Sequence, residues 1–147
     1  MLKHFSATVY VINIIDGVPK VLLHMHKKHH HWYGLGGHVE NNEDPVEAAR
    51  REAKEEAGID VAIFLPKKLF HTDGAQEVIA PVLMFDQKID EEHHHTDCIY
   101  FGTTADRLKV VMQEAFRWCS QKDLDSMDIQ SDTRYIVDEA FRAYETR

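Results

Sequence analysis

The first quarter of the chain alternates between apolar and polar positions with the period of a β-strand. Two runs rich in β-branched residues, 7–15 and 18–25, flank the dipeptide Asp16-Gly17. Asp-Gly between two such runs is a strong hairpin signal, so the pattern predicts two antiparallel strands. Pro19 favours an edge position or a strand beginning for the second run, because proline cannot donate a ladder hydrogen bond.

Apolar runs predict further strands downstream. Residues 78–87 are almost continuously apolar and predict a buried strand, whereas 90–97 are polar and predict a connection between strands. Shorter apolar or β-branched runs predict the remaining strands, at 61–65, 69–71, 98–101 and 114–119.

Residues 44–58 carry the start and stop signals of a helix. Asp44 precedes Pro45, and Glu47 stands three residues after Asp44, as in a capping box. Gly58 supplies the matching stop, since many helices end on a residue that adopts the left-handed conformation. We therefore expect a helix over this segment.

Two more helices are expected near the end of the chain. Ser120 and Asp123 are a cap pair for a short helix through Asp125, and Ser131 is the expected cap of a helix over 132–145. The latter has an apolar stripe that would dock on a sheet. Strands on both sides of one helix, with another helix at the end, predict an α/β fold: a mixed sheet sandwiched between helices, in one domain over 1–147.

Length and charge exclude several classes of protein. A chain of 147 residues fits one domain with its own core. No apolar run approaches the roughly 18 residues of a membrane span, so we expect no membrane partner. Cys98 and Cys119 lack metal-ligand spacing and read as free thiols in a reducing cytoplasm. The net charge of −8 disfavours binding of nucleic-acid polymers, and an anionic phosphate substrate would have to be received through metal ions.

The faces of helix 45–57 differ in chemistry. Small apolar residues at helical spacing suit close packing on a sheet: Val46, Ala49, Ala53 and Ala57. Glu52, Glu55 and Glu56 fan out over a neighbouring sector, where their like charges repel. A divalent cation would reverse the sign of that interaction. Oxygen ligands without cysteine point to Mg²⁺, or to Mn²⁺, and not to zinc or copper.

The segment 37–59 resembles the Nudix box, G-x5-E-x7-R-E-U-x-E-E-x-G-U, where U is a bulky aliphatic residue. All its fixed glycine, glutamate and arginine positions are present, as Gly37, Glu43, Arg51, Glu52, Glu55, Glu56 and Gly58. Ile59 fits the last U position, whereas Ala53 departs from the first, a change that removes no ligand. The chain is therefore similar to Nudix hydrolases, which cleave a nucleoside diphosphate linked to another group by water attack on phosphorus.

The resemblance implies roles for the residues of the box. Glu52, Glu55 and Glu56 would bind one to three Mg²⁺ ions, with Glu52 or a downstream acid as general base. The carbonyl of Gly36 would join them as a ligand, and Glu40 would lie close by. Arg51 would orient a glutamate as its ion-pair partner. Glu43 would support the loop or bind an outer metal.

Further candidates lie outside the box. A basic or polar residue in the second strand region often reaches the substrate in this family, which makes Lys27, Lys28 and His29 candidates. His29, His30 and His31 would point to alternate sides of an extended segment, so they favour a loop rim over one metal site. Family members frequently add an acidic residue from the region of Glu91, Glu92 and Asp97, with Asp97 or His95 favoured to face the site.

The substrate is narrowed mainly by elimination. Some ADP-ribose pyrophosphatases carry a proline where Gly74 stands, and the tyrosine of some dinucleoside polyphosphate hydrolases is absent nearby. A nucleoside triphosphate or a modified nucleotide is the leading expectation. An ADP-ribose or nucleotide-sugar pyrophosphatase and a nucleotide sensor without catalysis remain alternatives; an isomerase of allylic diphosphates would need a catalytic cysteine. The protein could be a monomer or a homodimer.

Overall fold

The two predicted N-terminal strands form the centre of a mixed sheet in the computed structural model of the chain, which describes residues 1–26, 28, 30–65, 67–106 and 115–147. β1 (Leu2–Ile15) pairs antiparallel with β2 (Val18–His26), as predicted. Asp16 and Gly17 both have positive φ in the turn between them. β1 also begins five residues earlier than the apolar alternation suggested.

β1 is central because it pairs with three strands. It runs parallel to β7 (His93–Thr103) along one edge. Along its other edge it runs antiparallel to β4 (Leu35–His38) and, further along, to β2. The other strands pair with β7 or with β2. β6 (Leu83–Asp90) and β5 (Ala62–Ile63) pair with β7. β3 (His31–Tyr33) and β8 (Phe116–Cys119) pair with β2. Parallel and antiparallel pairing in one sheet confirms the predicted mixed α/β architecture.

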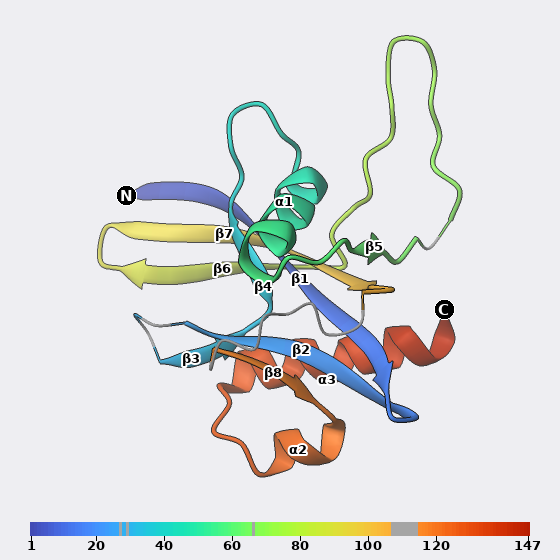
Figure 1. Cartoon of the computed structure of the whole chain (residues 1–147). Helices are drawn as coiled ribbons and strands as arrows, with labels where there is room; N and C mark the ends of the chain where they lie inside the picture. Colours follow the sequence, from blue (N-terminus) through green and yellow to red (C-terminus); the bar gives the residue numbers. More distant parts are fainter. Residues whose placement is uncertain (27, 29, 66, 107–114) are drawn as a thin grey trace.

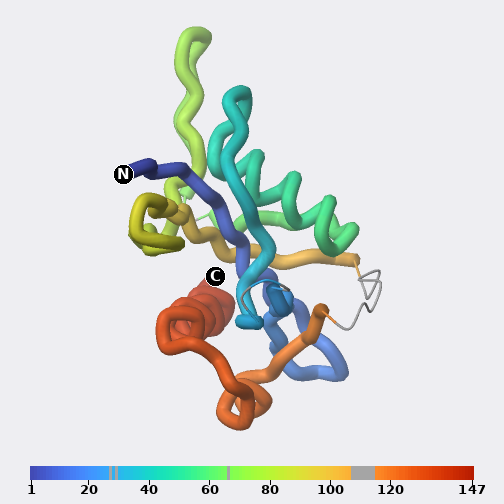
Figure 2. Tube along the Cα trace, turned by 90° about the vertical axis from the view of Figure 1, so that its left-hand side faces the viewer, coloured from blue at the N-terminus to red at the C-terminus, as the bar shows by residue number. Residues whose placement is uncertain are grey.

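Helices cover the two faces of the sheet (Figures 1 and 2). Val9 and Val11 of β1 pack in a buried cluster with α1 (Pro45–Ala57), whereas Tyr10 and Ile12 pack in a second cluster with α3 (Ser131–Thr146). α2 (Gln121–Asp125) connects β8 to α3. The alternation of β1 thus divides the core into two halves, one under each long helix.

The predicted ends of α1 are confirmed. The Asp44 side chain accepts from the backbone N–H of Glu47, and the Glu47 side chain accepts from that of Asp44. Gly58 adopts the left-handed conformation, with φ of 69°, and its N–H donates to the Lys54 carbonyl. The predicted cap pair of Ser120 and Asp123 likewise starts α2.

The prediction for 78–97 is wrong in two respects. The strand in this region begins at Leu83, and Val78 and Val82 before it are 46% and 48% exposed. β6 pairs with β7 alone among the described strands and alternates between covered and exposed positions, as a strand near a sheet edge does. The polar stretch 93–97 is also no connection, because it is the first half of β7 and pairs with the start of β1. Pairing with β1 outweighs the polar composition.

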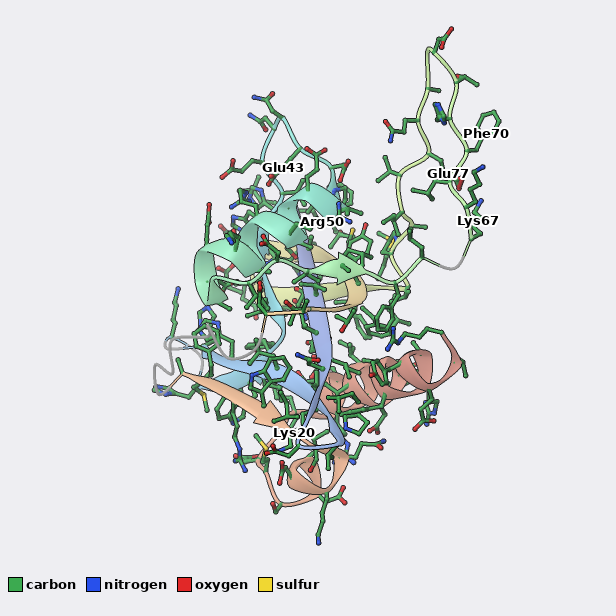
Figure 3. The ribbon with its side chains drawn as sticks, turned by 45° about the vertical axis from the view of Figure 1, so that its right-hand side comes forward. Lys20, Glu43, Arg50, Lys67, Phe70 and Glu77 are labelled. Carbon is green, nitrogen blue, oxygen red and sulfur yellow. The ribbon has the colours of Figure 1, made fainter. Side chains whose placement is uncertain are left out.

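Three smaller predictions are also corrected. Residues 69–71 contribute one isolated bridge, between His71 and Gln76, within the projecting segment that Figure 3 marks with Lys67, Phe70 and Glu77. The strand predicted over 61–65 is confined to β5. Ser131 is the first residue of α3, and Gln130 before it is the N-cap, without a side-chain cap bond.

In the described part of the chain, no helix is long and apolar enough to cross a membrane.

Candidate active site

β4 and α1 bring the two ends of the box together. β4 pairs with β1 so that Gly36 stands opposite Thr8, and α1 packs directly on β4. The backbone N–H of Gly36 donates to Oε1 of Glu56 at 2.9 Å. A Cβ atom on Gly37 would lie 2.4 Å from Oε1 of Glu52. The glycines therefore let two helix carboxylates lie against the strand backbone.

Arg51 connects the loop, the helix and the strand through its guanidinium group. It contacts Glu43 at 2.7 Å, Glu52 at 3.0 Å and Glu55 at 3.2 Å, and it donates to the His38 carbonyl at 3.0 Å. Figure 3 shows Glu43 near the start of α1. The positive charge of Arg51 offsets the repulsion expected among the glutamates of the helix.

Two glutamates that contact Arg51 differ in proton affinity. Hydrogen bonds from Arg51 hold the pKa of Glu43 below its ordinary value. Burial raises the pKa of Glu52, as do the nearby charges of Glu56 and Glu55, and this outweighs the opposing effect of Arg51. Glu52 is thus the more basic of the two carboxylates.

His24 is a site residue that the sequence analysis missed. Its Nδ1 lies 3.1 Å from Oε2 of Glu56, and its ring stacks on Phe116 with centroids 4.5 Å apart. Leu22, two residues earlier in β2, packs in the cluster under α1. The period of the strand therefore directs His24 to the same face, a signal that the apolar pattern already contained.

Divalent-metal binding is compatible with the chemistry of this cluster, because Glu52, Glu55 and Glu56 offer oxygen ligands that suit a hard ion. Among the described residues, no three side chains of His, Cys, Asp or Glu already converge as a metal site. Arg51 holds Glu52 and Glu55, while Gly36 and His24 hold Glu56. An ion would thus have to replace some of these contacts.

A pocket of about 620 Å³ lies on the sheet face that α3 covers. Gly36, Gly37 and His38 of β4 line one border of it, so the same strand touches both the glutamates and the pocket. The rest of the lining comes from β1, β2, β3, β6, β7 and the start of α3: Ser6, Thr8, Tyr10, His26, Tyr33, Phe85, Asp86, Gln87, Lys88, Ile89, His95, Asp97, Gln130 and Asp132.

Asp97 is the buried acid of this pocket. It is 5% exposed and accepts hydrogen bonds from the hydroxyl groups of Ser6 at 3.0 Å and Thr8 at 2.9 Å. Burial raises its pKa to about 6, although the two hydroxyl groups act against the rise. Ser6 and Thr8 were also missed, yet their spacing in β1 places both on one face with Tyr10.

The structure separates the remaining sequence candidates. Asp97 and His95 line the pocket, whereas Glu91 and Glu92 are exposed in the turn between β6 and β7. The Glu91 side chain is 89% exposed and pairs with Lys88. Register places Glu92 beside Leu2, at the start of β1, while β4 pairs from Ser6 onward. Lys27 and His29 lie outside the described residues, and Lys28 between them is exposed.

Comparisons with known proteins agree with the motif and the fold. A family model described as the NUDIX domain matches residues 4–140. A solved structure of a NUDIX-family hydrolase from Clostridium perfringens is 31% identical, with a TM-score of 0.77 and coverage of 99% of both chains. The Ap4A hydrolase of C. elegans is 20% identical, with a TM-score of 0.63 and coverage of 97% of this chain and 98% of its own, which shows a shared fold.

A curated relative matches a shorter part of the chain. The RNA pyrophosphohydrolase of Bartonella henselae is 41% identical over 59 residues, which are 39% of this chain and 34% of that protein. The chain thus matches about a third of the length of this relative. The family model covers nearly the whole chain, and the solved structure of similar length is a hydrolase. The chain therefore belongs to the Nudix family of hydrolases.

Proposed function

We propose that this hydrolase cleaves a nucleoside triphosphate or a modified nucleotide with Mg²⁺ or Mn²⁺ held by Glu52, Glu55 and Glu56. The carbonyl of Gly36 would add a ligand. The observation that carries the proposal is the double contact of β4: Gly36 and Gly37 meet the helix glutamates and also line the pocket. A diphosphate lying across β4 would connect a nucleoside in the pocket to the carboxylate cluster.

Metal ions held by the glutamates would neutralise the charge of a phosphate substrate, which a protein of net charge −8 does not offset by itself. A bound divalent ion would screen the diphosphate oxygens and lower the pKa of the attacking water. Glu56 would be the firmest ligand, since the Gly36 N–H and His24 orient its two oxygens separately. His24 would thus act as a positioning residue for Glu56.

Glu52 is the proposed general base. Its pKa is raised by burial and by its acidic neighbours, which makes it a better proton acceptor than a solvated glutamate. Arg51 bonds to Glu52 at 3.0 Å and would hold its side chain in place while one oxygen receives the proton from water. In this account Arg51 positions the base, and it does not contact phosphate.

The pocket would take the nucleoside. Asp97 and Asp132 offer hydrogen-bond acceptors, and Tyr33 and Phe85 offer aromatic surface on which a base could lie. A purine that presents N–H donors would match the Asp97 carboxylate, whose two oxygens already accept from Ser6 and Thr8 but retain further lone pairs. The Tyr33 hydroxyl group donates to Oε1 of Gln130 at 3.4 Å, and these two side chains would border the nucleobase.

Three alternatives make different demands on this site. An ADP-ribose or nucleotide-sugar pyrophosphatase would use the same glutamates with a different pocket occupant. RNA, the substrate class in the name of the Bartonella henselae relative, would need a path for polymer across an acidic protein. A sensor without catalysis would have no use for all three glutamates.

The test is turnover on a panel of nucleoside triphosphates, oxidised nucleotides, ADP-ribose, nucleotide sugars, dinucleotides and 5′-triphosphorylated RNA, with Mg²⁺ and with Mn²⁺. Glu56→Gln should keep the fold and lower turnover by about 100-fold or more, the scale for a group that acts in the transition state. Glu145→Gln is the matched control, because Glu145 is an exposed glutamate of α3.

Near-normal turnover in Glu56→Gln would refute the assignment of Glu56. Turnover confined to ADP-ribose, nucleotide sugars or RNA would replace the proposed substrate by that class. Metal-dependent nucleotide binding without turnover on any substrate would favour the sensor.

A further inference from the structure

Four histidines from three strands form one cluster of rings, and two of them line the pocket. They are His4 of β1, His38 of β4, and His93 and His95 of β7, whose first residues run beside the start of β1 (Figure 1). The register of the strands explains this cluster. His95 of β7 pairs with His4 of β1. Ser6, the next residue of β1 on the same face as His4, pairs with His38 of β4. The strand period then puts all four on the pocket face.

The rings are in mutual contact. His38 and His95 have centroids 4.7 Å apart, His4 and His93 4.8 Å, and His93 and His95 5.0 Å. His94, between two members of the group, instead bonds to Asp86 at 3.0 Å. The alternation of side chains along the strands therefore decides which histidines belong to the cluster, and adjacency in the sequence does not.

Two ring nitrogens already stand at a separation that suits a shared ion. Nε2 of His38 and Nε2 of His95 are 3.0 Å apart. Nitrogens bound to one tetrahedral Zn²⁺, at about 2.0–2.1 Å each, are about 3.3 Å apart. An ion between them would need a shift of a few tenths of an ångström and no movement of the backbone.

A third nitrogen lacks a partner. Nε2 of His93 is buried and has no hydrogen-bond partner among the described residues. A buried polar atom without a partner costs free energy unless a ligand supplies one. In the described chain no three such side chains already converge at ligand distance, so His4 or His93 would turn to complete the set.

We propose that His38 and His95, joined by His93 or His4, form a second metal site, which takes a borderline-soft transition-metal ion such as Zn²⁺. Imidazole nitrogen favours such ions, whereas the oxygen cluster of α1 favours Mg²⁺ or Mn²⁺. The site goes beyond the proposed function and is independent of it. Because His38 and His95 line the pocket, a bound ion would place positive charge at the pocket wall.

The experiment is a calorimetric titration of the full chain, without an affinity tag, with Zn²⁺ in saturating Mg²⁺. We expect one Zn²⁺ per chain in the wild type, in Glu56→Gln and in His94→Gln, the control from the same strand. His38→Gln and His95→Gln should each weaken Zn²⁺ binding at least about tenfold, since loss of a ligand costs no less than loss of its supporting contacts.

Unchanged Zn²⁺ affinity in both His38→Gln and His95→Gln would overturn the proposal. So would loss of the site in Glu56→Gln with its retention in the histidine variants, because the ion would then belong to the glutamates. Co²⁺ binding to the wild type adds a test that needs no variant. Strong visible absorption bands of tetrahedral nitrogen coordination are expected, and weak bands of six-coordinate oxygen ligation alone would contradict the site.

Discussion

Arg51 illustrates how one side chain can define the geometry of a site at the residue scale. Its guanidinium reaches carboxylates on the loop and on the helix, and a carbonyl at the end of β4. The planar fork of arginine donates in several directions at once, which the point charge of lysine does not do. The sequence motif predicts an ion pair for Arg51. The structure adds that its guanidinium group connects three segments: the loop, the helix and the strand.

The adjacent glycines Gly36 and Gly37 should respond differently to alanine. In Gly37→Ala the new Cβ would meet the movable carboxylate of Glu52, so turnover should fall while the free energy of unfolding changes little. In Gly36→Ala the Cβ would lie 2.3 Å from the backbone oxygen of Ala7, so strand pairing and stability should suffer. Urea denaturation and turnover of both variants measure this contrast; equal stability losses would contradict it.

Asp97 should make the protein less stable as the pH rises from about 4 to about 6. Its pKa is raised from 3.8 to about 6 in the folded chain, so the folded state holds a proton that the unfolded state releases. The full penalty above pH 6 is about 3 kcal/mol from the shift alone.

Asp97→Asn keeps an acceptor for Ser6 and Thr8 and removes the charge. It should therefore stabilise the protein by about 1–3 kcal/mol at pH 8 and by little at pH 4. Urea denaturation of both proteins at the two pH values measures the difference. A gain of equal size at both pH values would show that ionisation of Asp97 is not its source.

At the scale of the element, helix α1 follows local rules and α3 departs from them. Asp44→Ala should cost about 1 kcal/mol, because it removes the carboxylate that accepts from the Glu47 backbone N–H in a formed capping box. Ser131→Ala should be neutral or slightly stabilising, since Ser131 is the first residue of α3 and not its N-cap, and alanine is the better helix former. Thermal unfolding compares the two variants, and a similar loss in Ser131→Ala would restore the cap that the sequence predicted.

The strands show where local patterns are insufficient. Residues 78–87 are apolar enough to predict a buried strand, but Val78 and Val82 lie outside any strand, and β6 begins at Leu83. The polar residues 93–97 pair with β1 because a parallel neighbour supplies hydrogen bonds to their backbone. Register with a distant strand therefore decides these elements, and no window of the sequence contains that information.

At the scale of the whole molecule, a metal ion bound to the glutamate cluster should stabilise the fold. An ion at 100 times its dissociation constant adds about 2.7 kcal/mol to the free energy of unfolding if it binds only the folded chain. For a domain of this size that corresponds to a melting temperature several degrees higher.

The shift should be absent from a Glu52→Gln/Glu56→Gln double variant, which removes two of the three glutamates of the cluster. Thermal unfolding with increasing Mg²⁺ tests this, with Glu145→Gln as the control. An equal rise of the melting temperature in the double variant would place the stabilising ion elsewhere.

The sequence by itself determined the features that depend on local spacing: the hairpin at Asp16-Gly17, the caps of α1 and α2, the small-residue stripe of α1 and the family. Capping and turn formation involve residues a few positions apart, so their signals survive in a short window. Only the tertiary structure decided that His24 meets Glu56, that Asp97 is buried with Ser6 and Thr8, and that four histidines gather beside the pocket. The contact between His24 and Glu56 depends on how α1 packs against the sheet. The others arise from the register between strands far apart in the chain, which packing of the two core halves around β1 sets.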